Sequence, residues 1–244
     1  MKYILILIHK LFLKNTLMKQ KFTILFDLDG TLVDTAPDLM SAHNHVMKKY
    51  GYPTKSTEDI RNLVGKGAGA LIGRSIWGQA KKEFGKIEDE KIKNKMVTEF
   101  IDFYAKNIVK ESKLVNGVKE FLKWCKNQNI SMAVCTNKQE HLSNDLLKKI
   151  GIYDYFEYVA GSDTFDYCKP DPRHLTSVIE ILDGDIKKTL MIGDSETDAN
   201  AAKAAEIPVI LLENGYTEKN SDEIYHNHLV KDFINIDKIV SKYL

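Results

Sequence analysis

Short runs of apolar residues recur along the chain, and each run ends in a polar loop followed by a helix-like pattern. Continuous apolar runs of this length are typical of strands that are buried on both faces of a parallel sheet. The predicted strands are 22–26, 132–135, a run that ends near 161, 190–192 and 209–212. Helical periodicity lies between them, over 118–127, 140–150, 172–182 and 198–205. The pattern predicts an α/β fold with a doubly wound parallel sheet.

The segment after the first predicted strand departs from this alternation. Residues 36–111 show helical periodicity with almost no strand pattern, interrupted by the glycine-rich stretch LVGKGAGALIG. Pro37 suits the first turn of a helix, with Asp34 or Thr35 as its cap. Long insertions at such a position often act as lids. We therefore predict a core made of 21–35 and 112–244, with a helical cap domain inserted at 36–111.

The first 20 residues are apolar but contain His9, Lys10 and Lys14. The apolar runs between these polar residues are too short to span a bilayer. No clear small-residue cleavage site follows them, as a signal peptide would require. We predict that 1–20 is a dispensable N-terminal extension, with a weak export or membrane-surface signal as the alternative.

Composition excludes several classes of partner. The 244 residues suit one main domain with a smaller inserted one. The formal net charge is +1, so no overall field attracts nucleic acid or an anionic membrane. The three cysteines are scattered, as is typical of reduced thiols in a cytoplasmic protein. We predict a cytoplasmic protein with no nucleic-acid or membrane partner, and the sequence leaves its oligomeric state open.

Acidic residues follow the ends of two predicted strands. Asp27 and Asp29 come directly after the first strand, Asp194 follows 190–192, and Asp198 lies one helical turn later. Ligands of such sheets bind at the carboxyl ends of the strands. Several carboxylates in one cleft repel each other, and a hard divalent cation removes that repulsion. Oxygen ligands with positions left for water suit Mg²⁺, which we therefore predict as the cofactor.

Groups that can donate to an anion occupy other strand ends and loops. Thr136 ends the predicted strand 132–135, and Lys169 lies in a later loop. Backbone N–H groups around Leu28, Asp29 and Asn137 add further donors. A cation and such donors opposite a carboxylate nucleophile describe a phosphoryl-transfer site.

Four short motifs resemble those of the haloacid dehalogenase superfamily in order and spacing. They are DLDGT at 27–31, Thr136-Asn137, Lys169-Pro170 and GDSETD at 193–198. Within that superfamily, the stretches FDLDGTLVDTAPDL, CTNK, KPDPRHL, GDSETDANAAKAA and NGY resemble bacterial phosphoglycolate phosphatases. The resemblance covers residues 22 to about 215, and it implies a Rossmann-like core with an inserted cap.

The resemblance also implies roles for the acidic residues. Asp27 would attack phosphorus and form an aspartyl-phosphate. Asp29 would protonate the leaving alkoxide and then deprotonate the attacking water. Mg²⁺ would bind Asp27, the backbone carbonyl of Asp29, and Asp194. Asp198 would orient Asp194 or a bound water, with the alternative that it is only a favourable acid in the first turn of its helix.

Other residues are implied to bind the substrate. Thr136, Asn137 and Lys169 would hold the phosphoryl oxygens. Lys66 and Arg74, in the glycine-rich part of the cap, are candidates for contacts with a substrate carboxylate. The alternative for this pair is that they are solvent-exposed helix and turn residues.

These expectations lead to a Mg²⁺-dependent phosphatase whose substrate is a small phosphorylated metabolite, 2-phosphoglycolate. A sugar phosphomutase or a pyrophosphatase of the same superfamily would keep the same core residues. A dehalogenase fits less well, because that chemistry needs neither Asp29 nor a metal. From a different class, a catalytically inactive phosphate-binding regulatory protein is the alternative, and the intact set of motif residues argues against it.

Overall fold

The computed structural model describes residues 20–77 and 87–244. The predicted N-terminal extension, apart from Gln20, lies outside these described residues. Within them, no helix is both long and apolar enough to cross a membrane.

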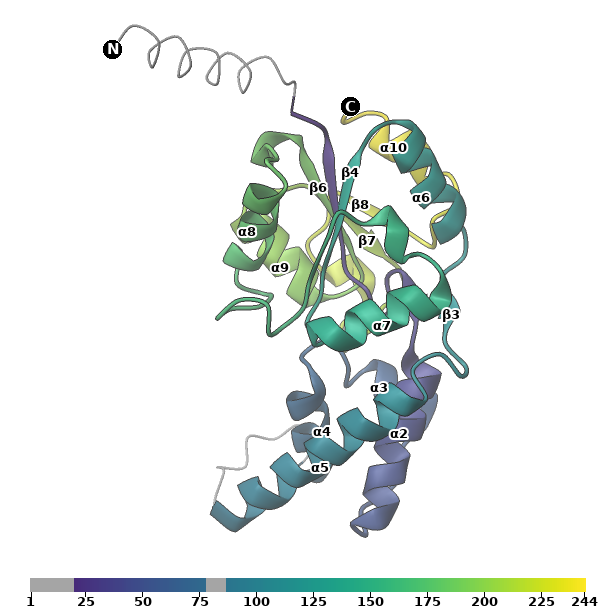
Figure 1. Cartoon of the computed structure of the whole chain (residues 1–244), viewed down its shortest axis with the longest axis vertical. Coiled ribbons are helices and arrows are strands. Elements are labelled where there is room, and N and C mark those ends of the chain that lie inside the picture. Colours follow the sequence, from purple (N-terminus) through teal and green to yellow (C-terminus); the bar gives the residue numbers. More distant parts are fainter. Residues whose placement is uncertain (1–19, 78–86) are drawn as a thin grey trace, which may run out of the picture.

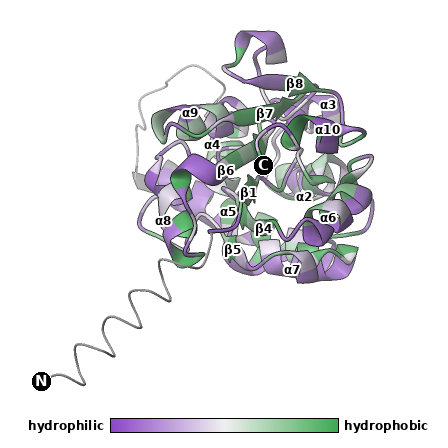
Figure 2. Ribbon diagram, turned by 90° about the horizontal axis from the view of Figure 1, so that it is seen from above, coloured by the Kyte–Doolittle hydropathy of each residue, from purple (hydrophilic) through white to green (hydrophobic). Residues whose placement is uncertain are grey.

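A six-stranded parallel sheet forms the centre of the molecule, with strand order β5-β4-β1-β6-β7-β8. The strands are β1 (Thr23–Phe26), β4 (Ser131–Cys135), β5 (Tyr158–Ala160), β6 (Thr189–Gly193), β7 (Val209–Leu212) and β8 (His228–Val230). Every residue of β1, β4, β6 and β7 is buried. Figure 2 shows these strands as a hydrophobic centre between more polar helices. The predicted parallel sheet is thus confirmed, because strands buried on both faces require continuous apolar sequence.

Helices cover both faces of the sheet (Figure 1). On one face lie α6 (Val118–Asn127), α7 (Glu140–Ile150) and α10 (Ile236–Val240), packed in one apolar cluster with Ile24 and Phe26. On the other lie α8 (Arg173–Ile181) and α9 (Glu196–Ala204), packed against Leu25, Met191 and Val209. Alternate residues of β1 therefore point to opposite faces, and the fold is the doubly wound α/β architecture that the pattern predicted.

Four further helices lie together beyond the carboxyl ends of the strands (Figure 1). They are α2 (Ala36–Lys49), α3 (Thr57–Arg61), α4 (Ala68–Trp77) and α5 (Ile87–Lys106), and α2 packs on α3 and α5 while α4 packs on α5. The chain leaves and re-enters the core through two short antiparallel strands, β2 (Val33–Asp34) and β3 (Lys113–Leu114). The helical insertion thus stands directly over the edge of the sheet where ligands bind in such folds.

A buried carboxylate fixes the return of the chain from these helices. Asp38, in the first turn of α2, accepts hydrogen bonds from the backbone N–H groups of Lys110, Glu111 and Ser112 and from the Ser112 hydroxyl, at 2.6–3.1 Å. The backbone N–H groups of this irregular connection have no acceptor in any of the described helices or strands, and the Asp38 carboxylate serves as their acceptor. The two ends of the helical insertion are tied together at this point.

A buried histidine on α8 makes the stability of the core sensitive to acid. His174 is fully buried, with its ring edge against Phe165. Burial, with a smaller effect from the positive charge of Lys169, lowers the pKa of His174 from 6.5 to about 4. Between pH 6.5 and 4, the folded chain therefore binds fewer protons than the unfolded chain. The contribution of neutral His174 to the free energy of unfolding is complete above pH 6.5 and is lost as the pH falls toward 4.

We expect His174→Leu to reduce this loss of stability. Between pH 6.5 and pH 4, the free energy of unfolding of the wild type should fall by about 3 kcal/mol more than that of the variant. Urea denaturation at a series of pH values measures both slopes. The exposed His141 is the matched control, and His141→Leu should keep the wild-type slope. Identical slopes for wild type and His174→Leu would contradict the assignment.

Candidate active site

The loop after β1 brings two aspartates to the carboxyl edge of the sheet. The backbone N–H of Asp27 donates to Ile192 of β6 at 2.9 Å, which extends the parallel pairing by one residue. Gly30 then turns the chain with a φ of +83°, and a Cβ at this position would collide with the carboxylate of Asp194. Glycine is therefore needed both for the turn and for the close approach of the β1 and β6 loops.

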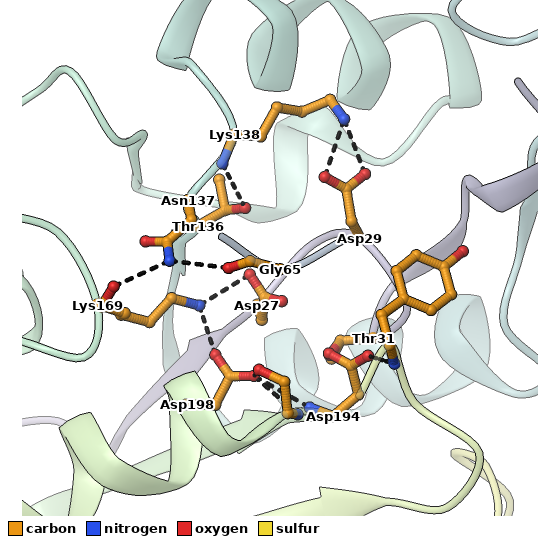
Figure 3. A network of polar contacts seen from close by, with 12 residues as sticks. Asp27, Asp29, Thr31, Gly65, Thr136, Asn137, Lys138, Lys169, Asp194 and Asp198 are labelled. Carbon is orange, nitrogen blue, oxygen red and sulfur yellow. Dashed lines mark hydrogen bonds and ion pairs between the residues drawn. The ribbon is translucent and has the colours of Figure 1, made fainter. Parts of the chain in front are cut away.

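Three buried carboxylates meet at this edge (Figure 3). One oxygen each of Asp27, Asp194 and Asp198 lie within 4.8 Å of one another. Burial raises the pKa of Asp27 to about 6, with Lys169 acting against this rise and the charges of Asp198 and Asp29 adding to it. Burial and the charges of Asp27 and Asp198 also raise the pKa of Asp194. Such mutual repulsion between buried oxygens is what a divalent cation relieves, so this cluster of oxygen donors fits a hard divalent cation.

Both oxygens of Asp198 are already occupied by protein donors. Oδ1 accepts from Nζ of Lys169 at 2.5 Å. Oδ2 accepts from the backbone N–H groups of Asp194 and Ser195 and from the Ser195 hydroxyl, at 2.7–3.2 Å. Asp198 thus holds the loop that carries Asp194, which supports the predicted orienting role. It also closes the first turn of α9 as the partner of Ser195 in a capping box.

Asp194 is held from two sides by residues distant in the sequence. Its Oδ1 accepts from the Thr31 hydroxyl at 2.9 Å, and its Oδ2 accepts from the backbone N–H of Tyr216 at 2.6 Å. The Tyr216 hydroxyl donates to Asp34 at 2.7 Å and accepts from the backbone N–H of Ala36 at 2.8 Å. Tyr216 therefore links Asp194 to the start of α2.

Lys169 is a buried cation between two of the carboxylates. Its Nζ lies 2.8 Å from Asp27 and 2.5 Å from Asp198. Burial alone would lower the pKa of Lys169, but the charges of Asp198 and Asp27 raise it above its usual range, so the side chain stays positive. One oxygen of Asp27 is thereby fixed, and its orientation is set.

Thr136 and Asn137 follow β4 at the same edge. The Thr136 hydroxyl accepts from the backbone N–H of Lys138 at 3.2 Å. The Asn137 amide donates to the backbone carbonyls of Gly65 and Lys169, at 3.0 and 2.9 Å. The Asn137 side chain therefore connects the loop before α4 with the loop of Lys169, and the predicted phosphate contact is left to its backbone N–H.

The sequence reasoning did not single out Lys138, which contacts Asp29 directly. Its Nζ lies 2.8 and 2.9 Å from the two oxygens of Asp29, and it stands 4.4 Å from the centre of the Tyr104 ring on α5. The Thr35 hydroxyl also donates to Asp29, at 2.7 Å. Thr35 stands at the N-cap position of α2 as predicted, but its hydroxyl makes no hydrogen bond to the backbone of the helix and binds Asp29 instead. The available signal was the position of Lys138 directly after the Thr136-Asn137 motif.

A cavity of about 280 Å³ lies between the strand ends and the helical insertion. The core side contributes Asp27, Asp29 and Lys169, and the helical side contributes apolar residues that include Leu71, Phe100 and Tyr104. The predicted catalytic acids thus face a partly enclosed cavity between the strand ends and the helical insertion.

Of the two predicted cap contacts, the structure brings only Lys66 to this cavity. Arg74 does not line the cavity, because its guanidinium is held in an ion pair with Glu218 and donates to the backbone carbonyls of Leu63 and Asn62. This placement gives no support to a substrate contact of Arg74, because its charge is paired with a residue distant in the chain.

Residues 24–212 match the haloacid dehalogenase-like hydrolase family, and the chain belongs to that family. The resemblance seen in the four motifs is thereby confirmed. A phosphoglycolate phosphatase of Caulobacter vibrioides is 38% identical over 216 residues, which cover 88% of this chain and 89% of that protein. One of Mesorhizobium japonicum is 37% identical over 210 residues, covering 86% and 90%.

A solved structure extends the comparison to three dimensions. A predicted phosphoglycolate phosphatase from Haemophilus somnus 129PT has a TM-score of 0.82 with 31% identity, and the match covers 91% of this chain and 99% of that one. With the family match and these relatives, the chain is identified as an enzyme, a phosphatase of the haloacid dehalogenase-like family.

Proposed function

We propose that the protein hydrolyses 2-phosphoglycolate to glycolate and phosphate, with Mg²⁺ as its cofactor and Asp27 as its nucleophile. The observation that carries the proposal is the environment of Asp27. One of its oxygens is fixed by Lys169 at 2.8 Å, and the residue lines the partly enclosed cavity beside Asp29. The names of the curated relatives support the choice of substrate.

In the first half of the reaction, Asp27 attacks phosphorus and the ester bond to the leaving oxygen breaks. Asp29 gives a proton to that oxygen, so glycolate leaves with a neutral hydroxyl group. In the second half, Asp29 takes a proton from water, and the water oxygen attacks the aspartyl-phosphate to release phosphate. Lys169, Thr136 and the backbone N–H of Asn137 hold the phosphoryl oxygens in both halves.

The proposed metal site consists of Asp27, Asp194 and the backbone carbonyl of Asp29. A bound Mg²⁺ would supply positive charge next to the phosphoryl oxygens and offset the repulsion between the two carboxylates. Thr31 and Tyr216 orient Asp194 for this task. Asp198 orients the loop of Asp194 and is not needed as a ligand, because its Oδ1 pairs with the ammonium of Lys169 and its Oδ2 already accepts three hydrogen bonds. Each oxygen of Asp194, by contrast, accepts only one hydrogen bond from the described residues.

The helices α2 to α5 are proposed to act as the cap that closes this site. The apolar side chains that they contribute to the cavity exclude bulk water from the phosphoryl group. The cavity volume of about 280 Å³ supports a small substrate. A cytoplasmic location, and a small phosphorylated metabolite as the partner, belong to the same proposal.

A substrate panel assayed with and without Mg²⁺ tests this function. Among 2-phosphoglycolate, glucose 1-phosphate, glucose 6-phosphate, AMP and pyrophosphate, we expect 2-phosphoglycolate to give the highest kcat/KM for phosphate release. A chelator should abolish the activity, and added Mg²⁺ should restore it, because Asp27 and Asp194 are then no longer in repulsion. A clear preference for pyrophosphate, or conversion of glucose 1-phosphate to glucose 6-phosphate, would overturn the substrate assignment in favour of those relatives.

A further inference from the structure

Lys138 has a placement that the reaction described above does not use. Its side chain is almost completely buried, and it reaches from the end of β4 into the same cavity as Asp29. Burial of an ammonium group is unfavourable unless other groups compensate its charge. Asp29 supplies that compensation on one side and the face of the Tyr104 ring on another.

The contact with Asp29 leaves Lys138 with unused capacity. An ammonium group carries three N–H donors, and the two oxygens of Asp29 account for two of them. Asp29 is also oriented by the Thr35 hydroxyl at 2.7 Å, so it does not depend on Lys138 alone for its position. One donor of Lys138 can therefore serve a group of the substrate.

The distance from the reacting atoms identifies that group. In the proposed reaction, Asp29 lies within hydrogen-bond reach of the leaving oxygen. Lys138 is one further contact away, at 2.8 and 2.9 Å from Asp29. The accepting group is thus attached to the carbon that bears the leaving oxygen, so that its own oxygen atoms lie three bonds from that oxygen. In 2-phosphoglycolate, the group at this separation is the carboxylate.

Other cavity lysines are less suited to this task. Among the described residues, three lysines line the cavity, namely Lys66, Lys138 and Lys169. Lys169 is held by Asp27 and Asp198, on the phosphoryl side. Lys66 lies between two glycines in the loop before α4, whereas Lys138 follows a buried strand and packs on Tyr104. Lys138 is buried and Lys66 is exposed. A buried cation next to apolar walls binds an anion more strongly than a solvated cation does.

We propose that Lys138 is a specificity residue that binds the carboxylate of the leaving group. The inference rests on the proposed function, since it assigns the part of the substrate that is not phosphate. Lys138 thereby makes the enzyme select short phosphate esters with a negative charge next to the ester oxygen. Tyr104 contributes by holding the ammonium in place from the helical insertion.

The test compares two esters that differ in this one group. 2-Hydroxyethyl phosphate replaces the carboxylate of 2-phosphoglycolate by an uncharged CH₂OH. We expect the wild type to prefer 2-phosphoglycolate, and Lys138→Met to lose on the order of 10²-fold in kcat/KM for it, mainly through KM. The loss for 2-hydroxyethyl phosphate should be at least about tenfold smaller, because it reflects only the lost contact with Asp29. Lys138→Gln keeps a donor for Asp29 without the charge, and it should lose the same preference if Lys138→Met does not fold.

Lys66→Met tests the rival assignment, because Lys66 also lines the cavity and was predicted from the sequence to contact a substrate carboxylate. It should keep the preference for 2-phosphoglycolate. A selective loss in Lys66→Met but not in the Lys138 variants would overturn the proposal, as would equal losses for both esters in the Lys138 variants. Failure of the wild type to hydrolyse 2-phosphoglycolate is a separate result: it refutes the proposed function, and the inference falls with it.

Discussion

Replacement of Asp27 by asparagine will reduce kcat for 2-phosphoglycolate by a factor on the order of 10⁴ or more. The amide has nearly the same shape, but it cannot form the proposed aspartyl-phosphate. Phosphate release under saturating substrate and Mg²⁺ measures the loss. Because the carboxylate is buried and its pKa is raised to about 6, its ionised form destabilises the fold at pH 7. We therefore expect the free energy of unfolding of Asp27→Asn to equal or exceed that of the wild type.

The combination of these two results separates loss of chemistry from loss of structure. Asp145→Asn, at an exposed aspartate on α7 that pairs with Lys149, is the control and should keep full activity and stability. Equal turnover by Asp27→Asn and wild type would instead favour the alternative of a phosphate-binding protein without catalysis. An inactive variant that is also unfolded would remove the support for the nucleophile assignment.

Four of the five strands that the sequence predicted are entirely buried, and the fifth, β5, is partly buried at the edge of the sheet. β1, β4, β6 and β7 are entirely buried, so their apolar runs stand out from the rest of the chain. β8 was missed because it is three residues long and only partly buried, at the edge of the sheet. β2 and β3 have two residues each, and such a pair is determined by the geometry of the connection rather than by a repeating pattern.

Helix boundaries were predicted less well where capping decides them. α9 begins at Glu196, two residues before the predicted start at 198. Ser195 at the N-cap and Asp198 three residues later form a capping box, a signal that was present in the sequence. The two predicted alternatives for Asp198, orientation of Asp194 and a favourable acid at the start of the helix, are compatible. One oxygen binds the loop of Ser195, and the other pairs with Lys169.

The part of the site that could be predicted from the sequence consists of residues that directly follow the ends of the strands. Asp27 and Asp194 follow adjacent parallel strands, so the topology alone brings them together. Lys138 and Tyr216 lie in the stretches CTNK and NGY, but their contacts with Asp29 and Asp194 are tertiary and cannot be derived from those stretches. Arg74 was interpreted from its charge alone. Its ion partner, Glu218, lies in a loop after β7, and this contact is seen only in the folded chain. Side chains that act through tertiary contacts are therefore the part that the sequence could not provide.

Lys169→Met will impair both turnover and stability. Without the ammonium, Asp27 loses the donor at 2.8 Å that orients it, and the phosphoryl group loses a cation. We expect kcat to fall by about 10²–10³ or more. Asp27 and Asp198 are then left as buried, unpaired charges, and breaking a buried pair in this way lowers the free energy of unfolding by about 3–5 kcal/mol. Urea denaturation and phosphate-release assays of the same preparation measure the two effects.

A double variant distinguishes the catalytic from the structural contribution of Lys169. Asp198→Asn removes one of the two unpaired charges while its amide oxygen can still accept from the loop of Ser195. In Lys169→Met/Asp198→Asn, part of the lost stability should therefore return, because repulsion between the buried carboxylates is reduced. Turnover should remain as low as in Lys169→Met, since the cation next to phosphorus is still absent. If activity returned together with stability, Lys169 would act only by holding the fold, and the phosphoryl contact assigned to it would be wrong.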